Sequence, residues 1–400
     1  MSERAIVHLD LDTFFVSVER RKDKRLQGKA IIVGGTGDRG VVAACSYEAR
    51  RFGIRAGMPL RTARQLCPEA IFMGGDYDAY QQESAIITEI IAEKAPLYEK
   101  ASVDEFYIDM TGMERFFGCY QWAGELRDSI IRETALPLSL GLSVNKLVSK
   151  VATGEAKPNG QLQIDGPAVS DFLAPMKVRK IPMIGRKTAL QLNYLGVRTV
   201  RRLREIPEPI LGRVFGRHGK LLYQRARGED DSPVVPYYEQ KSLSTEQTFS
   251  QDTIDVDWLE ARLVRMVEQL GFQLRKLHKL AACVTVKIRY TNFETLSRQT
   301  QISYTASDAI LIEKARFLFH KLYQRRVSVR LLGVKLTKLV PGGSQIELFQ
   351  SQARQLELYH SLDQLKLKHG GHILGRASGL TDSGEEEKRS RREGTRKILP

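Results

Sequence analysis

Two adjacent carboxylates, Asp104 and Glu105, lie inside the apolar segment ASVDEFYIDM, residues 101–110. The segment has the residue types of a β-strand, in which neighbouring side chains point to opposite faces of the sheet. One of the two carboxylates should therefore face the layer packed on the sheet, unless the chain turns there. A buried carboxylate without a partner is costly, so it binds a cation or takes up a proton instead. We therefore expect a positive charge close to Asp104 and Glu105.

A second pair of carboxylates, Asp10 and Asp12, ends the first predicted strand, AIVHLDLD. Its apolar residues Ala5, Val7, Leu9 and Leu11 share one face, and the opposite face carries His8, Asp10 and Asp12. A turn near residues 102–105 would bring Asp104 and Glu105 close to this strand end. Two carboxylates about 4 Å apart repel by about 4 kcal/mol at an effective dielectric of 20, so three together need a cation to stay ionised.

The ligand types limit which cation this is. The sequence offers no His/Cys cluster there to select zinc, and an all-oxygen ligand set favours Mg²⁺ or Mn²⁺ shared with substrate phosphates. The alternative is that Asp10 and Glu105 are helix caps or surface charges.

The whole chain has an ordinary globular composition, with 42% hydrophobic and 27% charged residues among 400. This length predicts two to four domains. No apolar run approaches the roughly 20 residues that span a bilayer, and the N-terminus shows no signal-peptide pattern. The four cysteines are scattered without a Cys-x-x-Cys pair, which favours a reducing cytoplasm and argues against structural zinc.

Positive charge is concentrated in two regions. Residues 1–165 hold 21 Lys and Arg against 23 Asp and Glu, whereas residues 166–230 hold 14 against 5 and residues 241–340 hold 17 against 9. Adjoining basic regions beside a nearly neutral one indicate a track for a polyanion, with nucleic acid as the first expectation. The alternative is a solvated basic surface.

The hydrophobic pattern predicts the order of elements. Strands and helices alternate up to about residue 165, short helices follow to about 230, and two prolines mark residues 231–241 as a linker. Residues 242–340 then read strand, helix, strand, strand, helix, strand. Val284, Val286 and Ile288 lie on one face of this sheet, so its other face should be open, polar and basic. A charged tail follows, and its segment SGEEEKRSRREGTRK has the composition of disorder.

Five motifs in this order resemble those of the Y-family translesion DNA polymerases, and most closely the bacterial DNA polymerase IV group. They are HLDLDTFFVSVE, VVAACSYEARRFGIRAGMP, SVDEFYIDMT, SVNKLVSKVATGEAKPNG and IPMIGRKTA. The resemblance covers residues 4–340 and implies an α+β multidomain fold, a right hand with palm, fingers, helix-hairpin-helix thumb and ferredoxin-like little finger. The implied boundaries are palm 1–17 and 77–165, fingers 18–76, thumb 166–230, linker 231–241, little finger 242–340, and clamp-binding peptide with tail 341–400.

The resemblance also implies roles for individual residues. Asp10, Asp104 and the main-chain carbonyl of Leu11 match metal ligands, and Glu105 matches the third catalytic carboxylate. Two Mg²⁺ ions, with Mn²⁺ as a substitute, are the implied cofactors. The implied reaction is template-directed, error-prone addition of dNTPs to a primer 3′ end, in lesion bypass and DNA repair. The motif-bearing region leaves no room for a proofreading exonuclease.

Further positions match the family's substrate contacts. Tyr47, Arg50 and Lys157 match residues that bind the incoming triphosphate, and Phe15 matches the aromatic steric gate that excludes a ribose 2′-hydroxyl. For each, the alternative is an ordinary surface charge or core aromatic. The family commonly has a threonine where this chain has Ala44, so a phosphate-binding hydroxyl is missing unless Ser46 compensates.

The segment QIELF resembles the peptide that ties bacterial polymerases to the sliding clamp, with Gln345, Leu348 and Phe349 as its contacts. The alternative is the first turn of an amphipathic helix. The expected partners are therefore primer–template DNA, dNTPs and the sliding clamp, with no membrane, for a cytoplasmic monomer. Two rival functions remain at this point. One is a catalytically silent DNA-binding factor on the same fold. The other is a diguanylate cyclase, because the segment GGDYD at residues 74–78 superficially resembles the signature of that enzyme class.

Overall fold

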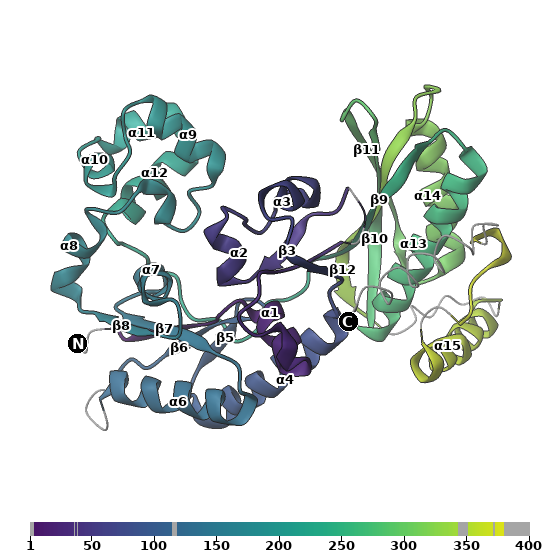
Figure 1. The fold of residues 1–400 in the computed structure, drawn as a ribbon. Coiled ribbons are helices and arrows are strands. Elements are labelled where there is room, and N and C mark those ends of the chain that lie inside the picture. The colour runs from purple at the N-terminus through teal and green to yellow at the C-terminus, as the bar shows by residue number, and fades with distance from the viewer. Residues whose placement is uncertain are drawn as a thin grey trace. The chain divides into compact units, whose positions relative to one another are not determined.

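The computed structural model describes residues 4–35, 37, 39–113, 118–342, 351–370 and 373–379, with the side chains of 351–356 excepted. The described chain forms two compact units, one extending to Tyr238 and the other beginning at Glu239, with the short loop 37–39 grouped with the second unit. Figure 1 labels most of the helices and strands of both units.

The first unit is built on a five-stranded sheet with the order β5-β6-β1-β7-β8. The central strand β1 pairs antiparallel with both β6 and β7, and β8 is parallel to β7. The strands are β1 (Ile6–Leu11), β5 (Tyr98–Lys100), β6 (Glu105–Asp109), β7 (Leu138–Ser143) and β8 (Gln161–Ile164).

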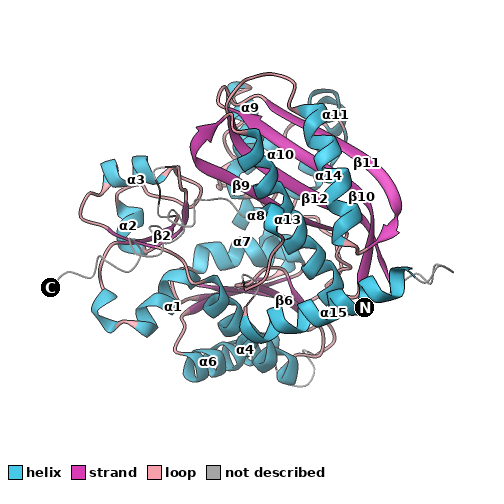
Figure 2. Cartoon of the chain, turned by 90° about the vertical axis from the view of Figure 1, so that its right-hand side faces the viewer, coloured by secondary structure: helices cyan, strands magenta, loops and turns pink. Residues whose placement is uncertain are grey.

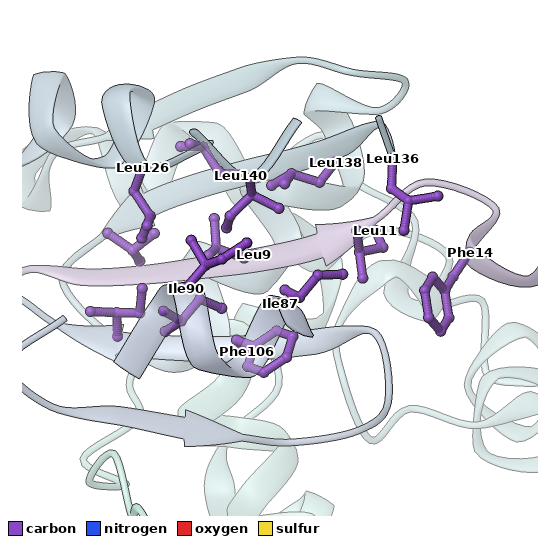
Figure 3. Close-up of a cluster of buried hydrophobic side chains, with 14 of the residues drawn as sticks. Leu9, Leu11, Phe14, Ile87, Ile90, Phe106, Leu126, Leu136, Leu138 and Leu140 are labelled. Atoms are coloured by element: carbon purple, nitrogen blue, oxygen red, sulfur yellow. The ribbon is translucent and has the colours of Figure 1, made fainter. Parts of the chain in front are cut away.

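One face of this sheet is covered by α4 (Tyr77–Lys94) and α6 (Cys119–Thr134) (Figure 1). Leu9 and Leu11 of β1 point into the apolar layer between sheet and helices, together with Ile87, Ile90 and Leu126 (Figure 3). This is the apolar face that the alternation in AIVHLDLD predicts. The short helix α1 (Phe14–Lys22) follows β1 directly and adds Phe14 to the same core.

The opposite face of the sheet meets α7 (Lys146–Ala156), whose first turn is capped by the Asn145 side chain. His8 on the polar face of β1 lies 2.9 Å from the hydroxyl of Thr153 on this helix. The backbones of α7 and β7 approach so closely that a Cβ at Gly141 would lie 2.3 Å from the Ser149 carbonyl oxygen. Glycine is therefore required there, and α7 is held firmly beside the end of β1.

Two smaller subdomains complete the first unit. A three-stranded sheet, β3-β2-β4, carries two helices over its own core around Ile32, Ile54 and Leu60. Its elements are β2 (Ile31–Gly34), β3 (Val42–Cys45), α2 (Tyr47–Arg51), α3 (Leu60–Leu66) and β4 (Ile71–Met73).

Short helices form the other subdomain and share an apolar core with α7 through Leu147, Val148 and Val151. They are α8 (Val169–Leu173), α9 (Arg186–Tyr194), α10 (Val200–Arg204), α11 (Glu208–Phe215) and α12 (Arg217–Ala226), with 3₁₀ turns Gly166–Ala168 and Val178–Lys180.

The second unit has a four-stranded sheet with the order β11-β10-β12-β9, and α13 and α14 lie across one of its faces (Figure 2). Its elements are β9 (Ser242–Thr253), α13 (Val256–Lys276), β10 (Lys279–Tyr290), β11 (Thr295–Thr305), α14 (Asp308–Leu322) and β12 (Val329–Pro341). The predicted order of strands and helices is confirmed. Val284, Val286 and Ile288 are fully buried against the helices, as the alternation predicts.

The prediction of one continuous strand over residues 101–110 is wrong in its first half. Residues 101–104 form the turn between β5 and β6, because the Ser102 hydroxyl accepts hydrogen bonds from the backbone N–H groups of Asp104 and Glu105 at 3.2 and 3.0 Å. Such local bonds of serine compete with sheet pairing. The turn considered as the alternative is the one that the chain adopts.

The predicted linker is partly fixed to the first unit. Residues 231–241 contain no helix or strand, yet Val234 is buried and the Val235 N–H donates to Glu99 at 2.8 Å. Glu99 is paired in turn with Lys146 of α7. The boundary between the units therefore falls after this anchored part, between Tyr238 and Glu239.

A tail segment packs on the second unit after the clamp-like peptide. Helix α15 (Ser351–His369) buries Tyr359, whose hydroxyl accepts from the Ala309 N–H at 3.2 Å. Arg275 of α13 joins this helix to α14 through Asp363 at 2.6 Å and Asp308 at 2.7 Å. Residues 345–349 and the charged segment 383–397 lie outside the described residues.

Candidate active site

The carboxylates predicted to act together meet at the end of β1. Asp10 lies directly opposite Glu105 in the antiparallel register of β1 and β6. The Leu11 N–H donates to the Asp104 carbonyl at 3.0 Å, which places the hairpin turn beside the end of the same strand. The Asp104 carboxylate accepts from the Ser102 hydroxyl at 2.5 Å. Asp10 and the adjacent pair Asp104 and Glu105, which lie about 95 residues apart in the sequence, are thus brought together at the end of β1.

Lysines from α7 and the loop after it supply the expected positive charge. Lys157 pairs with Asp10, and the Lys150 ammonium lies 2.5 Å from Glu105. In the described part of the chain, no three His, Cys, Asp or Glu side chains form a ready-made metal cluster. Asp10 and Glu105 are thus compensated by ammonium groups in this structure, as partly buried carboxylates require.

The electrostatics of Asp10 fit a cation-binding group. Burial raises the pKa of this carboxyl to about 6, Lys157 lowers it in opposition, and the neighbouring charges of Glu105 and Asp104 raise it further. A largely enclosed carboxylate close to two others disfavours an uncompensated negative charge and favours the binding of a hard divalent cation. The donor set of Asp10, Asp104 and Glu105 contains oxygen only, so the residues fit magnesium or manganese.

The residues expected to bind the triphosphate lie around a buried aspartate. The Tyr47 hydroxyl donates to Asp12 at 3.2 Å, and the Lys157 ammonium lies 3.6 Å from the same carboxylate. The Arg50 guanidinium stacks on the Tyr47 ring with 4.8 Å to its centroid. Burial, and secondarily the charge of Asp12, raises the pKa of Tyr47, so its phenol stays a neutral donor.

Phe15 stands one residue beyond the buried Phe14 and is only partly covered. Its ring stacks on Tyr80 at 4.2 Å between centroids and meets the edge of Tyr77 at 6.4 Å. Tyr80 is itself fixed by a 2.7 Å hydrogen bond to Glu19. The Phe15 ring is therefore held in one orientation by α4.

Ser46 does not replace the hydroxyl that is missing at Ala44. Its side chain is fully buried, caps α2 by accepting from the Ala49 N–H at 3.2 Å, and also accepts from the Ile31 N–H at 3.0 Å. A hydroxyl used in this way is not available to a phosphate. The GGDYD segment is equally committed, because Asp76 caps α4 and the chain continues as a helix rather than a hairpin.

Comparison with known proteins decides the family. Models of the impB/mucB/samB family match residues 9–154, and of its C-terminal domain residues 240–348. A DNA polymerase IV of Dehalococcoides mccartyi is 39% identical over 388 residues, 96% of this chain and all of that protein. Another, from Desulfatibacillum aliphaticivorans, is 34% identical over 96% of this chain and 98% of its own.

A solved Y-family DNA polymerase chimera superimposes with a TM-score of 0.75 at 27% identity, covering 84% of this chain and 99% of the chimera. This chain belongs to the Y family of DNA polymerases. The expected α+β right-hand architecture is confirmed by the same match. None of the described helices of this Y-family chain is long and apolar enough to cross a membrane.

Three polar residues of the Y-family site were not assigned a role from the sequence. The sequence predicted that Asp12 lies on the polar face of its strand. It did not predict that Asp12 is buried and contacts both Tyr47 and Lys157. Nothing in the sequence singled out Lys150 from the other lysine of its helix, although its spacing of four residues from Lys146 puts both side chains on one helix face. Ser139 has no sequence signal, because its contact with Asp12 at 3.0 Å depends on the pairing of β1 with β7.

Proposed function

We propose that this chain copies damaged DNA templates through a two-metal reaction at Asp10, Asp104 and Glu105. As a member of the Y family it is a DNA-directed DNA polymerase, a transferase that acts in translesion synthesis and DNA repair. The observation that carries the proposal is the meeting of Asp10, Asp104 and Glu105 at the end of β1.

Divalent metal is a general requirement of this family, and we assign it to Mg²⁺, with Mn²⁺ as a substitute. Asp10, Asp104, Glu105 and the Leu11 carbonyl would hold two ions. When bound, they supply a lowered pKa at the primer 3′-hydroxyl and neutralise the pyrophosphate that leaves. Lys150 and Lys157, which compensate the carboxylates here, are then free to turn toward phosphate oxygens.

The chain's own residues bind and orient the incoming nucleotide. Arg50 and Lys157 are charge-assisted donors suited to the triphosphate, and the neutral Tyr47 phenol adds a third donor. Phe15, stacked on Tyr80, is the proposed steric gate against a ribose 2′-hydroxyl. Since Ala44 lacks a hydroxyl and Ser46 is committed as a cap, these three donors carry the triphosphate.

Two surfaces suit the DNA backbone. A pocket of about 400 Å³ lies between α7 and the turn before α9, lined by Lys150, Arg179, Lys180 and Gly185 among others. Its backbone amides and cations are suited to a phosphate without reading sequence. In the second unit, Thr285, Lys287 and Arg289 pair with the polar residues Gln299, Ser297 and Thr295 on the open face of the sheet.

The subdomain assignments follow as proposals: palm 1–17 and 77–165, fingers 18–76, thumb 166–230, linker 231–241, little finger 242–340, and clamp peptide with tail 341–400. They are supported by the separate cores of the sheet, the three-stranded subdomain and the helical subdomain. The unit boundary after Tyr238 falls inside the proposed linker.

The clamp tether is a proposal from the sequence, since Gln345, Leu348 and Phe349 lie outside the described residues. Leu348 and Phe349 would fill an apolar pocket and Gln345 would bond at its rim. Replacing Leu348 and Phe349 together by alanine should weaken binding to the sliding clamp and leave extension without the clamp unchanged. Equal clamp binding by the variant would remove this assignment. The protein is proposed to be a cytoplasmic monomer until it meets the clamp.

Primer extension tests the function directly. The native protein, Mg²⁺ and four dNTPs are supplied with intact and lesion-bearing templates, beside an Asp104→Ala control. We expect extension past at least one lesion, with errors, by the native protein alone. Template binding without extension by the native protein would instead favour the catalytically silent DNA-binding factor. Product formed from GTP alone, without template, would favour the cyclase.

A further inference from the structure

Asp12 is the most completely enclosed carboxylate of the site. Its side chain is 1% exposed and accepts hydrogen bonds from the Tyr47 hydroxyl at 3.2 Å, the Ser139 hydroxyl at 3.0 Å and the Asn159 backbone N–H at 2.5 Å. The Lys157 ammonium lies 3.6 Å away. A carboxylate has about four acceptor positions, and here they are met by donors from the protein itself.

The donors come from three segments that are remote in sequence. Tyr47 begins α2 of the three-stranded subdomain, Ser139 lies in β7, and Lys157 and Asn159 belong to the loop after α7. Asp12 therefore joins this subdomain, the main sheet and the loop at one point. Ser139 reinforces the same point, since its hydroxyl also accepts from the Gly160 N–H at 3.3 Å.

Asp12 itself is held firmly. Its N–H donates to the Pro137 carbonyl at 2.8 Å, and its carbonyl accepts from the Ser17 hydroxyl at 2.7 Å. A fixed acceptor at the centre of several donors fixes those donors in turn, because each loses a charge-assisted hydrogen bond if it moves away. Tyr47 is placed by such a bond. Lys157, whose own hydrogen bond goes to Asp10, is placed by its ion pair with Asp12 and by the bond to Asn159 two residues further on. Both residues are assigned to the triphosphate.

We propose that Asp12 is a positioning residue for the incoming nucleotide, which aligns Tyr47 and the 157–159 loop before the triphosphate binds. The inference rests on the triphosphate-binding roles proposed for Tyr47 and Lys157. Asp12 is almost fully buried and cannot touch substrate, so it acts through its neighbours. A displacement of such groups by about 1 Å costs as much as about 100-fold in the rate of the reaction.

Asp12→Asn is the sharpest perturbation, because it keeps the shape and replaces one acceptor oxygen by an NH₂ donor that faces other donors. The KM for the correct dNTP should rise roughly 10- to 100-fold, the range for lost charge-assisted hydrogen bonds. The Kd for primer–template and the Mg²⁺ concentration for half-maximal rate should stay unchanged. Asp109→Asn is the matched control, because it makes the same substitution at the end of β6 opposite to Glu105, where the Asp109 carboxylate accepts from the Thr111 N–H at 2.9 Å.

A double-mutant cycle tests the route of the effect. Tyr47→Phe removes only the hydroxyl that Asp12 holds, so it should raise the dNTP KM in the native background and add little to Asp12→Asn. Ser139→Ala, a milder change at the same centre, should raise the KM several-fold with a smaller loss of thermal stability. It keeps the test decisive if Asp12→Asn does not fold.

The outcomes separate the inference from the proposed function. An unchanged dNTP KM in Asp12→Asn or in Ser139→Ala, or strictly additive effects with Tyr47→Phe, overturns the positioning role. A shifted Mg²⁺ requirement with an unchanged dNTP KM makes Asp12 a metal-site residue instead and also overturns it. If neither Tyr47→Phe nor Lys157→Ala changes the dNTP KM, the triphosphate assignment fails and the inference fails with it.

Discussion

Replacing Asp10 by asparagine should make the metal-free protein more stable at pH 7.5 while abolishing its activity. Asp10 is held in a largely enclosed position where its pKa is raised to about 6, against an ordinary value of 3.8. The cause is burial first, with Glu105 and Asp104 adding to it, and Lys157 only partly offsets the rise. At neutral pH the folded metal-free protein therefore carries a charge that its surroundings disfavour.

The magnitude follows from the shift of roughly 2 pKa units, each about 1.4 kcal/mol, which gives about 3 kcal/mol. Because the folded pKa is above the unfolded one, this contribution favours folding fully below pH 4 and is lost as the pH rises through 6. An asparagine does not ionise, so the Asp10→Asn variant does not lose this contribution. Its free energy of unfolding should therefore exceed that of the native protein by about 3 kcal/mol at pH 7.5 and equal it near pH 4. Lys157 keeps a partner in the variant, since Asp12 lies 3.6 Å away.

Thermal unfolding in EDTA from pH 4 to 8, on native protein and Asp10→Asn, measures this difference. For a unit of this size about 3 kcal/mol corresponds to roughly 6–12 °C in the midpoint. Adding Mg²⁺ should raise the native midpoint and leave the variant almost unchanged, because only a species that binds the folded state stabilises it. A variant that is equally stable or less stable than native protein at pH 7.5 in EDTA would refute the reasoning.

Three further outcomes are expected. Phe15→Val should raise ribonucleotide incorporation relative to deoxynucleotide by roughly 100-fold in single-nucleotide assays, and an unchanged ratio would remove the gate assignment. Tyr359→Ala should destabilise the packed tail by about 2 kcal/mol or more, seen as faster hydrogen exchange in α15, whereas the exposed neighbour change Leu358→Ala should have little effect. Lys335→Ala on the open sheet face should reduce the slope of log K against log salt by about 1 for DNA binding, and an identical slope would place the DNA elsewhere.

The sequence predicted well the features that depend on local periodicity. Leu9 and Leu11 alternate with Asp10 and Asp12, and the structure puts the first pair in the core and the second pair close to Lys157, in the loop after α7. The second unit was predicted element by element for the same reason, since its strands each bury one face. Sequence alone could not decide on which side of a turn Asp104 lies. Strand propensity and the Ser102 hydrogen bonds oppose each other there, and the local bonds prevail.

Tertiary contacts decided the remaining features. Asp12 became a shared acceptor only when β7 and the loop after α7 came beside it, and neither pairing has a local signature. Two prolines marked residues 231–241 as a linker, yet the Val235 backbone is anchored through Glu99. Likewise, Tyr359 packs on the second unit beneath the guanidinium of Arg275, which belongs to a helix about 80 residues earlier in the chain.

Single-turnover incorporation of one dNTP, with rapid quenching and a titration of Mg²⁺, tests the central claim most directly. The native protein is compared with Asp104→Asn and Glu105→Gln, which keep size and hydrogen-bonding shape while removing one charge each. We predict metal-dependent incorporation by the native protein and a loss of at least 100-fold in both variants, with primer–template affinity retained. Incorporation at the native rate by either variant would contradict the assignment of these carboxylates as the centre of the reaction.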